Sequence, residues 1–189
     1  MKLDFKLLAA VIIASQISAC VPVVVGGAAA GGAMAADRRT TGVYVEDQNI
    51  ELKAKKNIYD GLGGYANVSV TSFKGNILLT GEVPDEAAKA KAGDIAAATE
   101  SVRAVTNEIV VGPKTSISSR TNDAYLTSKV KAQFVTENRF QANYVKVVTE
   151  NGVVYLMGYV TQKEADDAVE IARNTSGVTK VVKVFEYKQ

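Results

Sequence analysis

Histidine is absent from the 189-residue sequence, and cysteine occurs once, at Cys20. Because imidazole and thiolate groups dominate metal sites, nucleophile–base pairs and proton relays, their scarcity argues against an enzyme, a metal site or a bound cofactor. A single cysteine also excludes a disulfide within the chain. Lys plus Arg number 22 and Asp plus Glu number 20, a net charge of +2. This balance argues against nucleic-acid binding, which requires a basic stripe.

A long apolar run is missing as well. The run that begins at Leu7 is broken at Ser15 and Gln16, and again by Pro22 and several glycines, whereas a membrane-spanning helix needs about 20 apolar residues. The first residues instead have the layout of a secretory signal peptide: two lysines, an apolar stretch over residues 7–14, and small residues before the cysteine. We therefore predict that residues 1–19 are a signal peptide that is removed.

The tetrad Ile17, Ser18, Ala19, Cys20 resembles the lipobox of bacterial lipoproteins. That resemblance implies that the Cys20 thiol receives a diacylglyceryl group, that the chain is cut before it, and that the new amine is acylated. Several acyl chains give stable anchoring, whereas one is marginal. The alternative is an ordinary buried cysteine. In such lipoproteins an aspartate after the cysteine retains the protein in the inner membrane. Val21 therefore implies the outer membrane of a Gram-negative cell, with the remaining chain in the periplasm. Residues 21–36 consist mainly of Val, Ala and Gly, and residues 37–46 are polar without strong periodicity, so we predict that residues 20–46 form a lipidated, flexible tether.

Beyond residue 46 the sequence repeats itself at an offset of 76 to 77 residues. Each copy opens with an aspartate and apolar residues at helical spacing, and continues with alternating apolar residues around a glycine turn, which predict a β-hairpin. An alanine-rich helix and a closing strand follow in each copy. We therefore predict an α+β fold, with two helices on a three-stranded mixed sheet per copy in the order α-β-β-α-β. The predicted domains are residues 47–113 and 122–189, joined by a linker over 114–121.

The matching segments are "DQNIELKAKKNI" from Asp47 and "DAYLTSKVKAQF" from Asp123, "VSVTSFKGNILLTGEV" from Val68 and "VKVVTENGVVYLMGYV" from Val145, "DEAAKAKAGDIAAAT" from Asp85 and "QKEADDAVEIARNT" from Gln162, and "VRAVTNEIVV" from Val102 and "VTKVVKVFEY" from Val178. The opening aspartate, the glycine late in the hairpin and the closing strand that begins at Gly177 resemble the BON domain. The first copy has Ser101 where the second has Gly177.

Two BON domains after a lipobox resemble the dual-BON outer-membrane lipoproteins. This resemblance implies binding to anionic phospholipids, such as phosphatidylglycerol and cardiolipin, through the second BON domain. It also implies enrichment at the cell division site, support of outer-membrane integrity, and assistance to the outer-membrane barrel assembly machinery.

The helix that opens the second copy offers a candidate lipid-binding face. Because residues advance by about 100° along a helix, Leu126, Val130 and Phe134 face the sheet. The opposite face combines apolar residues with cations, which suits docking on anionic headgroups; its residues are Tyr125, Ser128, Lys129, Ala132, Val135 and Arg139. The equivalent residues of the first copy are more polar, which favours the second copy; they are Asn49, Lys53, Lys56 and Tyr59. The resemblance places a tryptophan at position 125, and tyrosine is a smaller and more polar anchor.

Other interpretations of this face remain open. It could be an ordinary solvated surface or the seam between the two domains. It could also dock another envelope protein, as could an exposed strand edge, so a protein-interaction scaffold competes with a lipid-binding module.

Two further features predict no chemistry. The glycines of residues 61–64 indicate a loop, and Asp166 and Asp167 point apart on a helix.

Overall fold

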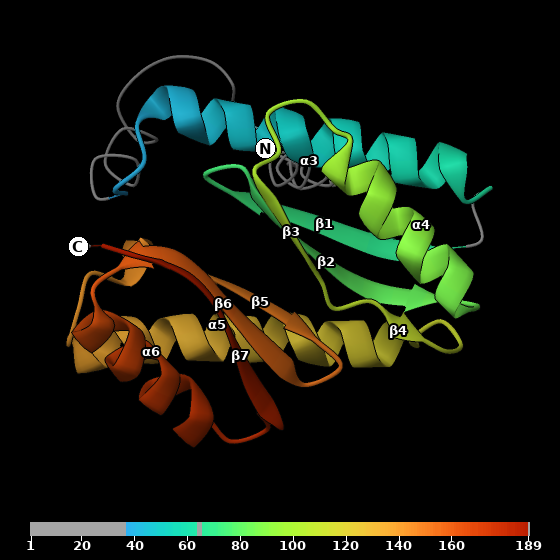
Figure 1. Cartoon of the computed structure of the whole chain (residues 1–189). Coiled ribbons are helices and arrows are strands. Elements are labelled where there is room, and N and C mark those ends of the chain that lie inside the picture. Colours follow the sequence, from blue (N-terminus) through green and yellow to red (C-terminus); the bar gives the residue numbers. More distant parts are fainter. Residues whose placement is uncertain (1–36, 64–65, 189) are drawn as a thin grey trace, which may run out of the picture. The chain divides into compact units, whose positions relative to one another are not determined.

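The computed structural model describes residues 37–63 and 66–188 (Figure 1), which all lie within the unit Ala33–Gln189. The predicted signal peptide, Cys20 and the tether up to residue 36 lie outside the described residues. Among the helices that are described, none combines the length and apolarity needed to cross a bilayer.

Each half of the described chain contains a mixed sheet with two helices beside it (Figure 1). The first half consists of α3 (Thr41–Gly61), β1 (Asn67–Phe73), β2 (Asn76–Val83), α4 (Glu86–Ala97), β3 (Ala104–Asn107) and β4 (Val110–Val111). The second consists of α5 (Ile117–Glu137), the 3-10 turn η2 (Ala142–Tyr144), β5 (Val145–Glu150), β6 (Val153–Val160), α6 (Gln162–Asn174) and β7 (Lys180–Tyr187).

Three strands have the same arrangement in both halves, and the first half has a fourth strand. The strand orders are β1-β2-β3 and β5-β6-β7, with the hairpin strands antiparallel and the closing strand parallel to the central one. The short β4 also pairs with β2, in parallel. The predicted α-β-β-α-β order and the α+β class are therefore confirmed.

The two hairpins turn through equivalent residues. Lys74 and Gly75 have φ values of 53° and 76°, and Asn151 and Gly152 have values of 50° and 75°. Two consecutive positive φ values are what a two-residue hairpin turn of type I′ requires, and they favour glycine and asparagine. A Cβ on Gly75 would also lie 2.8 Å from the Ser101 carbonyl oxygen. The turn sequence thus fixes the hairpin register in both halves.

Both opening helices begin earlier than predicted. α3 starts at Thr41 and α5 at Ile117, because the side chains of Thr40 and Ser116 cap them by accepting a hydrogen bond from the backbone N–H of the third helical residue. Residues 41–46, expected in the flexible tether, and residues 117–121, expected in the linker, are therefore helical.

The closing strand of the first half also differs from its prediction. Instead of one strand from Val102, β3 ends at Asn107 and β4 begins at Val110. At the break the Asn107 side chain accepts a hydrogen bond from the backbone N–H of Ile109 at 3.3 Å and donates one to the Lys89 carbonyl at 2.9 Å. This interruption buries the Ile109 side chain in the core. In the second half β7 is continuous.

Each half has its own hydrophobic core between helices and sheet. The first includes Ile50, Ile58 and Leu79, and the second includes Val130 and Phe134. A third cluster contains Phe73 and Leu78 of the first half with Tyr155 and Met157 of the second. Because neighbouring strand residues point to opposite faces, Leu79 faces the helices and Leu78 faces the other half. β2 and β6 are thus buried on both faces, and the halves form one unit.

Contacts across the two halves occur in equivalent pairs. The Asn151 side-chain amide donates to Glu82 at 3.0 Å, and the Lys74 ammonium lies 3.7 Å from the ring centroid of Tyr159. An offset of 77 residues relates Lys74 to Asn151 and Glu82 to Tyr159. Each hairpin turn therefore contacts the central strand of the other half at the same place.

The segments that precede the two opening helices also contact the opposite half at equivalent positions. Arg38 bridges to the second half: its guanidinium donates to the Tyr159 carbonyl and to both carboxylate oxygens of Glu164, at 2.7 to 2.8 Å. Just before α5, the Thr115 hydroxyl donates to Glu82 of the first half. Arg39 stays with the first half, where it pairs with Asp47 at 3.0 Å. The residues that lead into α3 and α5 thus help to hold the halves together.

Candidate functional site

The predicted lipid-binding residues lie on the solvent-facing side of α5. Leu126, Val130 and Phe134 are buried against the sheet, as the helical spacing predicts. We call the outward set the α5 stripe; it consists of Tyr125, Ser128, Lys129, Ala132, Val135 and Arg139.

The apolar residues of the α5 stripe are open to solvent. Tyr125 is 63% exposed and Val135 is 67% exposed, and Ser128 and Ala132 are also exposed, while Lys129 is half-buried. The seam between the halves is formed by other residues, from β1, β2 and β6. The structure therefore places Tyr125 outside that seam. Val135, although exposed, borders a hollow between the halves that Tyr44 and Phe73 of the first half also line.

The two cations of the α5 stripe differ in their surroundings. Arg139 follows the end of α5 and pairs with Glu137 at 2.7 Å, Glu170 at 3.0 Å and Asp167 at 3.8 Å. Its charge is therefore neutralised locally. Lys129 donates to the Ser176 carbonyl at 2.9 Å and has no ion-pair partner among the described residues. Lys129 thus supplies most of the net positive charge of the stripe.

The opening helix of the first half also carries exposed apolar residues. Val45, Leu52 and Tyr59 are 50%, 69% and 63% exposed, and their spacing of seven residues places them along one line of α3. The four residues compared in the sequence, Asn49, Lys53, Lys56 and Tyr59, omit Leu52, which the repeat aligns with Ser128. The α3 face is therefore less polar than the sequence comparison indicates. The seven-residue spacing could have revealed this line.

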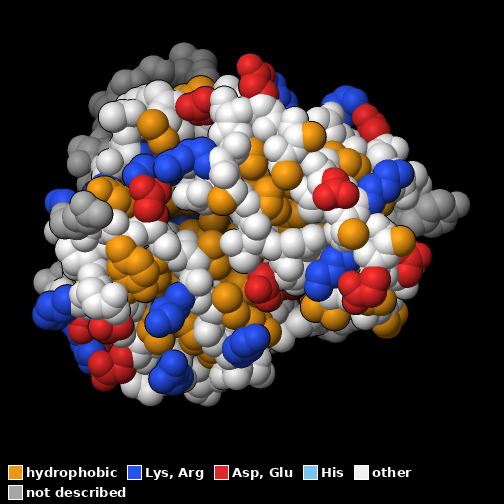
Figure 2. Space-filling view, in the orientation of Figure 1, with side chains coloured by type: hydrophobic (Ala, Val, Ile, Leu, Met, Phe, Trp, Pro, Cys, Tyr) orange, Lys and Arg blue, Asp and Glu red, His pale blue; other side chains and the backbone are white. Residues whose placement is uncertain are grey.

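The lysines of that α3 face are paired. Lys53 lies 2.8 Å from Glu100, and Lys56 lies 2.5 Å from Asp60. Across the face drawn in Figure 2, hydrophobic side chains are interspersed with both cationic and anionic ones.

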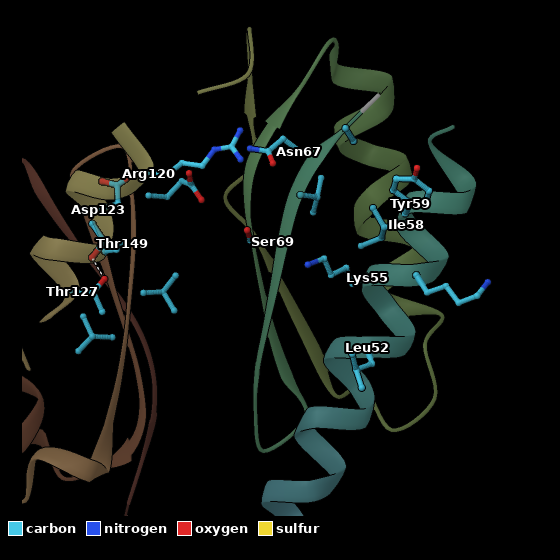
Figure 3. Close-up of a pocket in the computed structure, with 17 residues that line it drawn as sticks. Leu52, Lys55, Ile58, Tyr59, Asn67, Ser69, Arg120, Asp123, Thr127 and Thr149 are labelled. Carbon is cyan, nitrogen blue, oxygen red and sulfur yellow. Dashed lines mark hydrogen bonds between the residues drawn. The ribbon is translucent and has the colours of Figure 1, made fainter. Parts of the chain in front are cut away.

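A groove of about 830 Å³ opens between the two halves, and sequence reasoning missed it. Its walls come from α3 and α5, and its floor from β1 and β5. In Figure 3, Leu52, Lys55 and Tyr59 lie on one side, Arg120 and Thr127 on the other, and Ser69 of β1 between them. We call it the α3–α5 groove. It arises because the two halves meet through their strands, an arrangement that no single repeat specifies.

Two buried aspartates tie each opening helix to its hairpin. Asp47 accepts hydrogen bonds from the Ser72 hydroxyl at 2.6 Å, from Lys74 N at 2.8 Å and from Gly75 N at 2.9 Å. Asp123 accepts from Asn151 N and Gly152 N at 2.9 and 2.8 Å. Burial by itself would raise the pKa of Asp47, but these hydrogen bonds outweigh it and hold the pKa below its usual value. The aspartate that opens each repeat therefore has a structural role, because it holds the hairpin turn against the opening helix.

Two more carboxylates lie at the seam. Glu82 is 4% exposed and accepts hydrogen bonds from Thr115, Asn67 and Asn151. Burial would raise its pKa, but these donors lower it below the usual value. Burial, with the nearby charge of Glu82, raises the pKa of Glu150 instead. These groups do not form a metal site: among the described residues, no cluster of three or more His, Cys, Asp or Glu could hold an ion.

The two weaker sequence features are structural. Gly61 is the last residue of α3. Asp166 accepts from Gln162 at 2.9 Å and Asp167 from Lys163 at 2.7 Å, so each carboxylate serves its own partner.

The fold defines a tandem protein made of two α-β-β-α-β modules that share one seam. The BON domain model matches residues 46–113 and 122–189, which is most of the chain. The chain therefore belongs to the BON-domain family, with two copies of the domain.

Known relatives agree with this assignment. The chain is 39% identical over 170 residues to the outer membrane lipoprotein DolP of Haemophilus influenzae, covering 89% of this chain and 88% of that protein. It is 36% identical to the 21 kDa hemolysin of Actinobacillus pleuropneumoniae, covering 81% and 80% of the two chains. It is 29% identical to the osmotically-inducible protein Y of Escherichia coli, covering 74% and 72%. The predicted resemblance to dual-BON outer-membrane lipoproteins is confirmed.

Proposed function

We propose that this chain is a non-catalytic lipoprotein of the outer membrane that faces the periplasm, binds anionic phospholipid through the α5 stripe of its second BON domain, and thereby supports outer-membrane integrity. Its relative DolP is an outer membrane lipoprotein. The observation that carries the proposal is the exposure of Tyr125 and Val135 on α5, the helix that also carries Lys129.

The chemistry of the α5 stripe suits the region of lipid headgroups. Tyrosine partitions to the membrane–water boundary, where its ring meets apolar chains and its hydroxyl meets water. Val135 adds apolar area two to three turns along the same helix. A lysine near an anionic surface contributes about 1 kcal/mol to binding. The contribution of Lys129 should fall as salt rises, because the Debye length shrinks.

Anchoring at Cys20 would make this weak contact sufficient. An acylated Cys20 holds the BON domains close to the bilayer, so the α5 stripe acts at a high local lipid concentration. The contact then senses lipid composition instead of supplying the attachment. The acylation of Cys20 remains a prediction.

The first experiment is sedimentation of residues 33–189 with phosphatidylglycerol vesicles and with zwitterionic phosphatidylcholine vesicles. The chain should sediment with the anionic vesicles, and Tyr125→Glu should release it. Tyr59→Glu is a matched control, because Tyr59 has the same exposed fraction on the equivalent helix of the first half. Equal loss with both variants, or no loss with Tyr125→Glu, would refute the assignment to α5.

A second function is favoured by a separate observation, the exposed line of Val45, Leu52 and Tyr59 on α3. A protein scaffold that assists the outer-membrane barrel assembly machinery would use such a surface away from the lipid contact. Site-specific crosslinking in cells from positions 52 and 125 separates the two functions. A scaffold gives one dominant protein adduct at position 52, whereas a lipid contact alone gives none at either position.

A further inference from the structure

The α3–α5 groove contains an unpaired strand edge. In the described part of the chain, β1 is the outer strand of its sheet, with only β2 beside it. The backbone of Ser72 points outward, because its N–H donates to Glu51 at 2.8 Å and its carbonyl accepts from Lys146 at 3.3 Å. In an antiparallel pair the direction alternates from residue to residue. The N–H and C=O groups of Val68 and Val70 therefore also point away from β2.

The contacts of Ser72 close one end of this edge, and the groove begins at the other end. Asn67, Val68 and Ser69 line the groove directly. The unpaired part of the edge thus extends from residue 67 to residue 70, about 13 Å of strand at 3.3 Å per residue.

The walls of the groove provide side-chain contacts on both sides of this edge. The side chains of Val68 and Val70 pack on the first core, on the face of the sheet that α3 covers. A strand added beside β1 would direct alternate side chains to that same face, next to the exposed Leu52 and Tyr59. The intervening side chains would point toward Thr127 and the β5 strand.

The rim of the groove carries cations. Lys55 on α3 has no ion-pair partner among the described residues, and Arg120 on α5 donates only to the Thr115 carbonyl, at 3.1 Å. Asp123 and Glu150 also line the groove on the side of Arg120, whereas Lys55 lies on the opposite wall (Figure 3). The Lys55 side of the rim therefore favours an occupant with an acidic residue at that end.

We propose that the α3–α5 groove binds an extended peptide segment of a partner protein, which pairs with β1 as an added strand, places apolar residues against Leu52 and Tyr59, and places an acidic residue near Lys55. An acyl chain fits less well, because it would cover the polar groups of Val68 and Val70 without bonding to them. A peptide supplies the missing donors and acceptors. This proposal does not depend on lipid binding by α5, because none of the α5 stripe residues lines the groove.

The test is an NMR titration of ¹⁵N-labelled residues 33–189 with the synthetic peptide acetyl-Asp-Val-Thr-Val-Thr-Val-Asp-amide. We expect chemical-shift changes at the amides of Val68 and Val70 and slower hydrogen exchange at the same two amides. A peptide with N-methyl groups on alternate residues should bind about five- to tenfold more weakly, because it lacks the backbone donors.

Two protein variants complete the test. Lys55→Glu should weaken binding severalfold, whereas Lys91→Glu, on the exposed side of α4, should leave it unchanged. Tyr125→Glu should also leave peptide binding unchanged, which separates this site from the lipid contact. Equal binding of the N-methylated peptide, shifts confined to the α5 stripe, or protection of Val68 and Val70 by phosphatidylglycerol vesicles in place of the peptide would overturn the proposal.

Discussion

Truncation of Leu78 tests whether the two BON domains unfold as one unit. Leu78 is completely buried in the cluster that it forms with Tyr155 and Met157 of the second half. Replacing a buried leucine by alanine costs about 2–5 kcal/mol, according to how well the site collapses. For a unit of this size each kcal/mol lowers the Tm by about 2–4 °C, so Leu78→Ala should lower it by roughly 4–20 °C.

The neighbouring Leu79 provides the matched variant. It is equally buried but faces the core of the first half. Urea unfolding followed by NMR at the amides of Ala54 and Val130 reports on the two cores separately. If the seam couples the halves, each variant lowers the urea midpoint, and within each variant the Ala54 and Val130 reporters give the same midpoint. If Leu79→Ala shifts only the Ala54 reporter, the halves unfold independently and the coupling through the seam is wrong.

Two further predictions concern the buried carboxylates. Asp47→Asn should destabilise the protein by about 1.5–3 kcal/mol at pH 7, because hydrogen bonds to a charged acceptor are lost. The pKa of Asp47 in the folded protein lies below its usual value, so this difference in stability should shrink below about pH 4. Urea titrations at several pH values measure it. A constant difference down to pH 2 would contradict it. Glu150→Gln should stabilise the protein at pH 7, because the folded pKa of Glu150 is raised, and the gain should disappear below about pH 4; a loss of stability at pH 7 would show that Glu150 makes a favourable charged contact.

The topology of each half was predictable because the repeat presents the same local pattern twice. The glycine turn at Gly75 and Gly152 fixes each hairpin, and the acidic first turn and alanine-rich sequence predict the second helix. The starts of α3 and α5 were not predictable, because Thr40 and Ser116 are followed by turns without apolar periodicity. Those turns are held by the segments just before them, through Arg38 and Thr115, which contact the other half.

The candidate site was predictable only in part. The 100° step along a helix correctly placed Leu126, Val130 and Phe134 inside and Tyr125 outside. The pairing of Arg139 could not be foreseen, because Asp167 and Glu170 come from α6, about 30 residues away in the sequence. The α3–α5 groove depends on the seam between the halves. The sequence does not indicate that the face of β2 that carries Leu78 packs against the other half.

Residue-resolved NMR of residues 33–189 during titration with phosphatidylglycerol-containing micelles tests the central claim most directly. The proposed function predicts that amide shifts concentrate on α5 around Tyr125, Lys129 and Val135, that they weaken as salt is raised, and that zwitterionic micelles produce far smaller changes. Shifts that concentrate on α3 around Leu52 and Tyr59, or that are equal for the two kinds of micelle, would contradict it.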